Sequence, residues 1–297
     1  MTLPDPVTWA IPLFGVLVVA EMVRARHHGD VTYEAKDAAA SMTMGFGNTL
    51  AKLLTGGIAV SVIAFVHHYR LFDIGYAAWA FVVCFLLEDL SYYWFHRISH
   101  ERRWFWASHV VHHTSQHYNL STALRQTWTG SIGATFIFWL PMAWIGFPPA
   151  MIAFFSGLSL VYQFWIHTEA IDRMGPLEWV LNTPSHHRVH HATNPRYLDS
   201  NYAGVLIIWD RMFGTFVEET KADKPIYGVV SNIHTFNPFR IAFHEWVGMV
   251  RDVLHAKSWR DRLNFAFGPP GWSPDGSRPT SATLKAAWRA KQREENP

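Results

Sequence analysis

The sequence predicts an all-α integral membrane protein with about five spans and a cytosolic helical cap rich in histidine. Three observations support this fold class: five apolar blocks, the placement of lysine and arginine between them, and three histidine segments on one predicted side. Apolar residues make up 49% of the 297-residue chain and charged residues 16%. The formal net charge of only +2 does not indicate a basic surface for binding nucleic acid, so no such partner is expected. The single cysteine, Cys84, excludes a disulfide framework and a CxxC metal site.

Five apolar blocks of 15 to 19 residues are candidates for membrane spans; they cover residues 8–23, 49–66, 77–95, 131–145 and 150–166. Each lies at the short end of the roughly 17–25 residues that a helix needs to cross a bilayer. The last two blocks could instead form a hairpin that dips into the bilayer without crossing it. Buried helices of a soluble protein are the other interpretation, but five such blocks are many for one soluble core of this size.

Lysine and arginine are distributed unevenly around these blocks. Basic residues follow the first, third and fifth blocks, whereas Arg70 alone lies in the loop after the second. Because cytoplasmic loops carry the excess of Lys and Arg, this pattern predicts an external N-terminus and a cytoplasmic C-terminal half. The same topology places the three densest histidine segments on the cytoplasmic side.

The composition divides the chain into three parts. Residues 1–75 form the N-terminal membrane spans, residues 76–235 a core with the three histidine segments, and residues 236–297 an amphipathic C-terminal region and tail. In the third part, NPFRIAFHEWVGMVRDVLHAKSWRDRL mixes aromatic, apolar and basic residues, which suits a helix lying along the membrane surface. An ordinary amphipathic helix on a cytosolic domain fits this pattern equally well.

The segment TPSHHRVHHATN, residues 183–194, holds four histidines within six residues. Thr183 can cap a helix, Pro184 suits its first position, and the Asn-Pro pair at the end can stop it. Three of the histidines then share one helix face at spacing i, i+3 and i+4: His187, His190 and His191. His186 points elsewhere.

Two upstream segments carry the same kind of spacing. HVVHH repeats the i, i+3, i+4 pattern, and HRISH has histidines at i and i+4 where the third block ends. Together the three segments supply eight imidazoles: His96, His100, His109, His112, His113, His187, His190 and His191. One metal takes roughly four to six ligands, so eight histidines suggest two metals. His167, at the inner end of the fifth block, is either a ninth ligand or a satisfied interfacial histidine.

Carboxylates near the histidines are candidates for catalytic or orienting roles. Asp89 lies seven residues before His96 on the same helix face and can orient that imidazole through its far nitrogen. Glu101 can act in the same way, or can be a solvated charge at a helix end. Further polar candidates for supporting the ligands are Asn119, Asp199 and Asn201. The zinc-protease signature HExxH is absent.

Imidazole is a good ligand for iron, zinc, copper and nickel. Because neutral ligands leave the metals electron-poor, an all-imidazole pair at the membrane face favours oxygen activation on a lipid over hydrolysis. A membrane metal-binding or transport protein is the alternative class. Transporters place ionisable groups near the midplane of the bilayer, whereas these histidines lie at span ends and beyond.

The histidine segments resemble those of the fatty acid hydroxylase and sterol desaturase superfamily of membrane di-iron enzymes. Over roughly residues 89–216 the sequence is most similar to the alkylglycerol monooxygenase branch. The segments that carry this similarity are YYWFHRISHE, HVVHHTSQHYNLSTALRQ, QFWIHTEAI, GPLEWVLNTPSHHRVHHATN and YLDSNYAGVLIIWDRMFGTF.

This resemblance implies an oxidoreductase, a di-iron monooxygenase that hydroxylates a lipid at the ether-linked carbon of an alkylglycerol. The product would collapse to a fatty aldehyde and a glycerol derivative. The implied cofactors are two iron ions, dioxygen and tetrahydrobiopterin as reductant, and the implied partners are a lipid substrate and the bilayer. A hydroxylase or desaturase of another lipid is the alternative among enzymes, acting on a fatty acyl chain, a sterol, a carotenoid or an amino-acid lipid.

Overall fold

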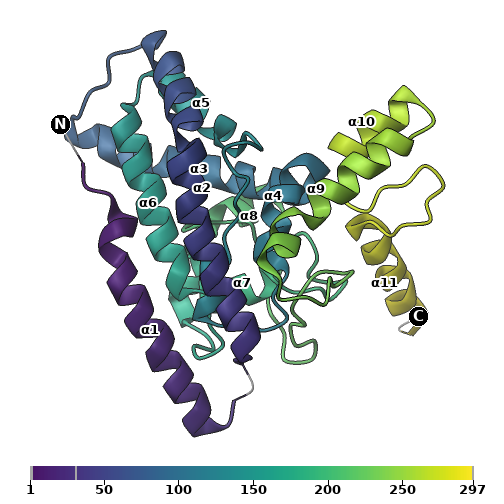
Figure 1. The fold of residues 1–297 in the computed structure, drawn as a ribbon. Coiled ribbons are helices and arrows are strands. Elements are labelled where there is room, and N and C mark those ends of the chain that lie inside the picture. Colours follow the sequence, from purple (N-terminus) through teal and green to yellow (C-terminus); the bar gives the residue numbers. More distant parts are fainter. Residues whose placement is uncertain (1–2, 31, 296–297) are drawn as a thin grey trace.

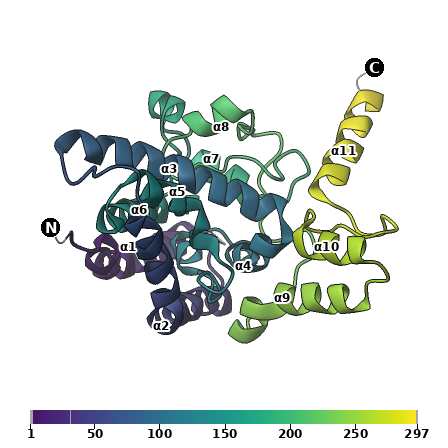
Figure 2. The ribbon, with the colours of Figure 1, turned by 90° about the horizontal axis from the view of Figure 1, so that it is seen from above.

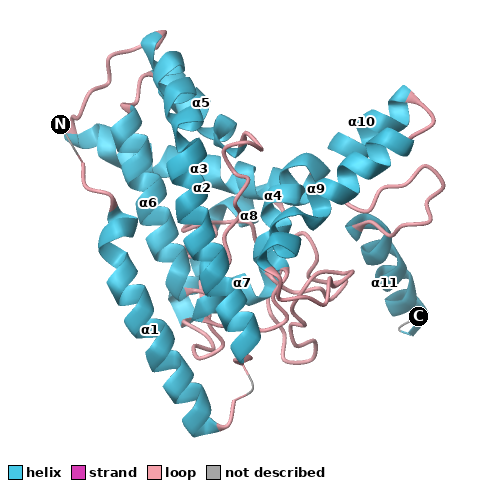
Figure 3. Ribbon diagram, in the orientation of Figure 1, coloured by secondary structure: helices cyan, strands magenta, loops and turns pink. Residues whose placement is uncertain are grey.

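The computed structural model describes residues 3–30 and 32–295, in which helices and loops form the fold (Figures 1 and 3). These residues contain no strand, only isolated bridges such as that between Leu181 and Leu206. The prediction of an all-α protein is therefore confirmed. Residues 1, 2, 31, 296 and 297, which the first and third predicted parts of the chain include, lie outside the described residues.

Eleven α-helices and three short 3-10 helices follow one another along the described residues. The α-helices are α1 (Pro6–His28), α2 (Ala35–His68), α3 (Ala78–Glu101), α4 (Arg103–His113), α5 (Leu140–Ile145), α6 (Pro149–Trp165), α7 (Pro184–His190), α8 (Ile208–Phe213), α9 (Pro238–His255), α10 (Trp259–Phe267) and α11 (Ser281–Glu295). The 3-10 helices are η1 (Leu120–Leu124), η2 (Thr135–Trp139) and η3 (Gly175–Trp179).

Three helices, α1, α2 and α3, are long and apolar enough to cross a membrane. They have 23, 34 and 24 residues. At a rise of about 1.5 Å per residue, each exceeds the roughly 30 Å hydrocarbon core of a bilayer. Their apolar side chains are largely exposed, and the most apolar stretch of α2 has no buried residue. These three helices therefore suit a lipid environment, as the first three apolar blocks predict.

The fourth and fifth predicted spans differ from a pair of crossing helices. Residues 135–145 form η2 followed by the six-residue α5, and α6 has only 17 residues. Ala134 adopts a left-handed φ of 56°, a conformation that cannot continue a right-handed helix from the preceding residues. Five full spans are therefore not confirmed. Both are apolar but shorter than the three long helices, and the alternative, a hairpin that dips into the bilayer, stays a prediction.

Helices α1, α2 and α6 run side by side, and α3 crosses them at a steep angle (Figures 1 and 2). An apolar core between α3, α5 and α6 includes Cys84, Met142 and Met151. Helix α4 begins directly after α3 and packs against it, while α9 and α10 pack against each other and against α4. These contacts bring the histidine-bearing ends of α3, α4 and α6 together with α7 at the centre of the molecule.

Candidate metal centre

Nine buried or half-buried histidines gather in two adjoining groups. Cluster A consists of His96, His100, His109, His113 and His190. Cluster B consists of His112, His167, His187 and His191. Within each cluster, one ring nitrogen of every histidine lies within 4.8 Å of the others. The structure thus brings together all eight histidines of the three segments, and it adds His167 as the ninth.

Each HxxHH segment contributes to both clusters. In α4, His109 and His113 belong to cluster A and His112 to cluster B, while in α7 the histidine that joins cluster A is His190. All three histidines of each segment turn toward this centre, but they divide between its two clusters, a division that the helical spacing did not predict. Consecutive residues are about 100° apart around a helix, so the adjacent pair at the end of each segment straddles two sites. The rings of His113 and His191 consequently stack across the boundary, with centroids 4.4 Å apart.

Backbone carbonyls fix the orientation of four of these rings through Nδ1. The Nδ1 atoms of His96 and His167 each lie 2.7 Å from a carbonyl oxygen, those of Tyr202 and Gln163. The corresponding distances are 3.0 Å from His190 to Ser200 and 3.3 Å from His112 to Arg125. A carbonyl only accepts, so Nδ1 carries the proton in these rings and Nε2 presents a lone pair.

The Nε2 lone pairs point at one another. The Nε2 atoms of His112 and His167 are 3.0 Å apart, although both rings have used their proton at Nδ1. Nε2 of His96 lies 2.9 Å from that of His109. Two lone pairs at this distance repel unless a cation lies between them. In cluster A, the buried Nε2 atoms of His100 and His190 have no hydrogen-bond partner. This donor set fits a transition metal that prefers nitrogen ligands.

Burial keeps the imidazoles outside the membrane-spanning helices neutral. Desolvation lowers the pKa of His112 to about 4. It holds the pKa values of six others well below their ordinary value: His109, His113, His167, His187, His190 and His191. Neutral imidazole is the form that binds a metal, so the site presents its ligands in that form at neutral pH.

A single loop, residues 198–202, orients three histidines of cluster A. Besides the carbonyls of Ser200 and Tyr202, it supplies the carboxylate of Asp199, 3.6 Å from Nδ1 of His100. Asp199 and Asn201 adopt left-handed φ values of 47° and 55°, which are costly for residues other than glycine. The surrounding contacts must therefore hold this loop in place.

Buried polar side chains fix the 198–202 loop. The side chain of Asn201 donates to the carbonyls of His186 and Val217, at 3.0 and 2.8 Å. The carboxylate of Asp210 accepts from the backbone N–H groups of Tyr202 and Ala203, both at 2.8 Å. Asn201 was a candidate from the sequence, whereas Asp210 was missed. The signal that could have found Asp210 is an acidic residue directly after the apolar run GVLIIW.

The two carboxylates proposed from the sequence lie apart from the imidazoles. Asp89 accepts from the backbone of Val205 and Leu206 and from the indole N–H of Trp209, at 2.8 to 3.0 Å. Its predicted contact with the far nitrogen of His96 is not formed, because Nδ1 of His96 pairs with the carbonyl of Tyr202 instead. Glu101 forms an ion pair with Arg97 at 2.8 Å and contacts no cluster histidine. This position agrees with the alternative prediction, a charge at the end of a helix.

Two other sequence candidates occupy structural positions. Asn119 caps η1, accepting from Ser121 N–H at 3.0 Å. His186 is buried but belongs to neither cluster, and its ring packs edge-on against Phe216. It therefore points away from the other histidines of its segment, as the sequence predicts. A further support that sequence reasoning missed is Arg125, whose carbonyl faces His112 and whose buried guanidinium pairs with Asp37 of α2 at 2.6 Å.

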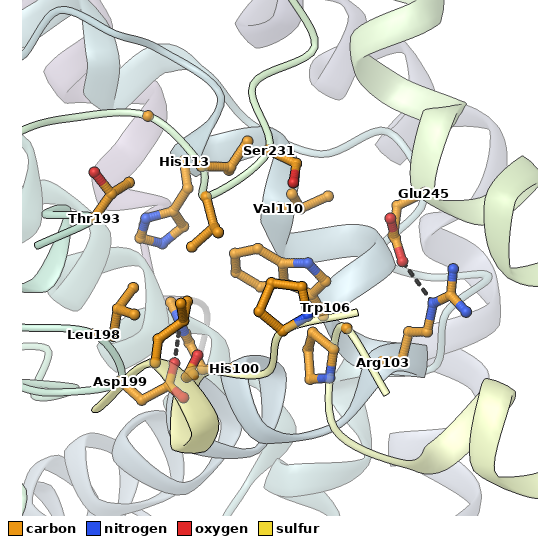
Figure 4. Close-up of a pocket in the computed structure, with 18 of the residues that line it drawn as sticks. His100, Arg103, Trp106, Val110, His113, Thr193, Leu198, Asp199, Ser231 and Glu245 are labelled. Atoms are coloured by element: carbon orange, nitrogen blue, oxygen red, sulfur yellow. Dashed lines mark hydrogen bonds and ion pairs between the residues drawn. The ribbon is translucent and has the colours of Figure 1, made fainter. Parts of the chain in front are cut away.

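A cavity of about 320 Å³ opens onto cluster A (Figure 4). His100, His113 and Asp199 form one side of it, with Trp106 beside them. The C-terminal region closes the other side through Glu245 of α9 and the segment 270–284, of which several residues line the cavity. Among the histidines of cluster B, only His191 lines this cavity.

Comparison with known proteins agrees with this geometry. The family model described as fatty acid hydroxylase matches residues 81–215, a range that contains all nine clustered histidines. The chain is 41% identical over 278 residues to the alkylglycerol monooxygenase of Homo sapiens, which covers 93% of this chain and 62% of that protein. It is 40% identical over 277 residues to the alkylglycerol monooxygenase of Xenopus tropicalis, covering 93% and 61%.

A more distant relative is the ornithine lipid hydroxylase OlsE of Rhizobium tropici, 23% identical over 156 residues, 52% of this chain and 47% of that protein. No solved structure matches the chain. The chain spans about three fifths of the length of the two alkylglycerol monooxygenases. Residues 81–215 thus match the fatty acid hydroxylase family, which the histidine segments predicted, and 93% of the chain is similar to the two alkylglycerol monooxygenases.

Proposed function

We propose that the chain is a membrane-bound monooxygenase that uses two irons to hydroxylate a lipid, at the carbon next to the ether oxygen of an alkylglycerol. The observation that carries the proposal is the convergence of Nε2 lone pairs in two adjoining all-imidazole clusters. Similarity to alkylglycerol monooxygenases over 93% of the chain supports the substrate class.

The residues of the chain have distinct roles in this proposal. Cluster A would hold one iron and cluster B the other, and the bound irons would supply the activation of dioxygen. The imidazoles provide neutral ligands, and the carbonyls behind them keep each Nε2 directed inward. Buried aromatic rings around the clusters, such as Tyr118 and Tyr202, exclude water from the site. Exclusion of water protects a reactive oxidant from side reactions.

The cavity beside cluster A bears on the source of electrons. Its volume of about 320 Å³ suits a small organic molecule rather than a protein partner. Tetrahydrobiopterin, as the implied reductant, is a molecule of this class. The excess of basic residues after α1, after α3 and in the C-terminal half supports a cytoplasmic position for the clusters and the cavity.

Labelled oxygen tests the proposed reaction. The chain, expressed in cells without this activity, would receive an alkylglycerol lipid and ¹⁸O₂, with rapid trapping of any aldehyde. We expect a hydroxylated lipid or aldehyde that carries the label and is absent from cells expressing His113→Ala. Label that enters a stable hydroxylated product only from water would contradict a monooxygenase.

A hydroxylase of another lipid is the second candidate, supported by the similarity to the ornithine lipid hydroxylase. Mass spectrometry of whole lipid extracts from cells with and without the chain separates the two. An added oxygen atom on an ester-linked or amino-acid lipid, with ether lipids unchanged, would replace the alkylglycerol as substrate and leave the chemistry intact.

A further inference from the structure

Helix α9 has an apolar face that is largely exposed. Five residues three or four apart form this face, called here the α9 stripe: Phe239, Phe243, Val247, Val250 and Leu254. Their exposed fractions run from 39% at Phe243 to 71% at Leu254. This spacing is that of one side of an α-helix. The other side is buried, including Ile241, Ala242 and Met249.

The α9 stripe begins against α2, the longest of the apolar helices. The ring of Trp128 lies 5.4 Å from that of Phe239 and 6.2 Å from that of Phe243, between ring centroids. Its indole N–H donates to the carbonyl of Met44 in α2 at 3.0 Å. The neighbouring Phe46 is 68% exposed. Trp128 thus joins the first residues of the stripe to α2, while Ile241 and Ala242 on the buried side of α9 pack with Met44 of α2.

From this contact α2 and α9 diverge as the two arms of a V (Figure 1). Both arms present exposed apolar side chains, such as Leu53 on α2 at 78% and Val247 on α9 at 64%. A bilayer that surrounds α2 would extend into the V and reach the α9 stripe. The exposed apolar surface of the two helices is therefore continuous at the point where they meet.

The charges around the stripe fit a lipid surface. Five basic residues between residues 238 and 267 are all exposed: Arg240, Arg251, Lys257, Arg260 and Arg262. Of the three acidic residues in this stretch, Glu245 and Asp252 turn inward and pair with Arg103, at 2.6 and 2.7 Å. The outward surface is thus apolar and positively charged, the pattern by which amphipathic helices bind anionic bilayers.

We propose that the α9 stripe contacts the hydrocarbon of the bilayer that surrounds α2, with the basic residues directed to anionic phospholipid headgroups. This proposal rests on the proposed membrane placement of the clusters but not on the identity of the oxidised lipid. Since Glu245 of α9 also lines the cavity beside cluster A, the anchored helix would hold that cavity at a fixed height relative to the membrane surface.

Single-cysteine labelling of the full chain in proteoliposomes tests this placement. The native Cys84 is fully buried, so an environment-sensitive fluorophore would react at an introduced cysteine, with the unmodified chain as the labelling control. The variants are Val247→Cys and Val250→Cys in the stripe and Ala287→Cys on the exposed, polar helix α11. Vesicles contain phosphatidylcholine with or without phosphatidylglycerol, and with or without bromine on the acyl chains.

We expect the emission of both stripe labels to shift to the blue and to be quenched by brominated lipid, more strongly when phosphatidylglycerol is present. The label at Ala287→Cys should respond to aqueous iodide instead. Iodide quenching at the stripe positions equal to that at Ala287→Cys would overturn the proposal. A blue shift without bromolipid quenching would also overturn it, because the stripe would then be covered by protein. In that case a disulfide between two Val250→Cys chains would identify the covering protein as a second copy of the chain. Lipid oxidation is measured on the unmodified chain, so its absence would reject only the proposed function.

Discussion

Clusters A and B use the same ligand chemistry but are supported in different ways. In cluster A, the 198–202 loop faces three of the five histidines, and two of its residues have left-handed backbones. In cluster B, the carbonyl of Gln163 at the end of α6 and that of Arg125, paired with Asp37 of α2, hold His167 and His112. Identical imidazoles can therefore be supported by a loop with left-handed residues at one site and by residues at helix ends at the other. The two sites should respond separately to substitutions in their supports.

The clusters also differ in access. Three histidines of cluster A, His100, His113 and His190, line the cavity that the C-terminal region closes, whereas cluster B contributes only His191 to its wall. Tyr118, which is buried and does not line the cavity, packs against three rings of cluster B. We therefore expect a soluble reactant to meet cluster A first and cluster B to be the more enclosed site.

The largest effect should come from removing one ligand of each cluster. His96→Ala should reduce bound metal from about two ions per chain to about one, and His167→Ala should do the same at the other site. Turnover should be lost in both variants, because each iron is required in the proposed reaction. Metal analysis of the purified variants, with circular dichroism to verify folding, measures this. Two ions retained in His167→Ala would remove the ninth histidine from the ligand set.

The next largest effect should be a loss of folding stability when the metal-free chain is acidified. Burial lowers the pKa of His112 to about 4. It also lowers the pKa values of the other buried imidazoles outside the spans, such as His187 and His191, below the ordinary value near 6.5. Above that value folded and unfolded chains are both neutral at these rings, so pH has little effect. Below it the unfolded chain takes up protons that the folded chain does not, so stability falls by about 1.4 kcal/mol per pH unit for each such ring.

Thermal unfolding of the metal-free protein in detergent, at pH 7.5 and pH 5.5, measures this loss. Bound metal should reduce the loss at pH 5.5, because it favours the folded, deprotonated rings. An unchanged melting temperature between the two pH values would mean that water reaches the imidazoles in the folded chain.

The sequence was sufficient for the ligand types, because i, i+3 and i+4 spacings put histidines close together on any helix. It also predicted the three long apolar helices correctly, since length and hydropathy are local properties. The assignment of ligands to sites was beyond it. Which histidine of an HxxHH segment serves which metal depends on how α4 and α7 face each other, a property of tertiary packing. The same holds for Asp89, whose partners Val205 and Leu206 lie more than a hundred residues away.

A substitution behind the 198–202 loop should weaken cluster A alone. In the wild-type chain the two carboxylate oxygens of Asp210 accept hydrogen bonds from the N–H groups of Tyr202 and Ala203. Asp210→Asn replaces one of these oxygens by an NH₂ group, which is a donor and cannot accept from a backbone N–H. Loss of such a support typically lowers metal affinity about 10–100-fold. Titration of the metal-free variant should show one weakened and one unchanged site, whereas Asp172→Asn, an exposed acid away from the loop, should leave both unchanged. Equal weakening of both sites would mean that the loop supports the whole centre.

The smallest effect should come from His186→Ala, directly beside a ligand of cluster B. The His186 ring packs on Phe216 outside both clusters, and the contact that it makes to the 198–202 loop uses its backbone carbonyl, which alanine retains. The variant should lose about 0.5–3 kcal/mol of stability from the emptied ring position and keep both metals. Its neighbour His187→Ala should lose the metal of cluster B. The metal content of the two variants, measured side by side, decides the point. If His186→Ala lost a metal while His187→Ala kept both, His186 would be the ligand in place of His187, and the composition of cluster B would be wrong.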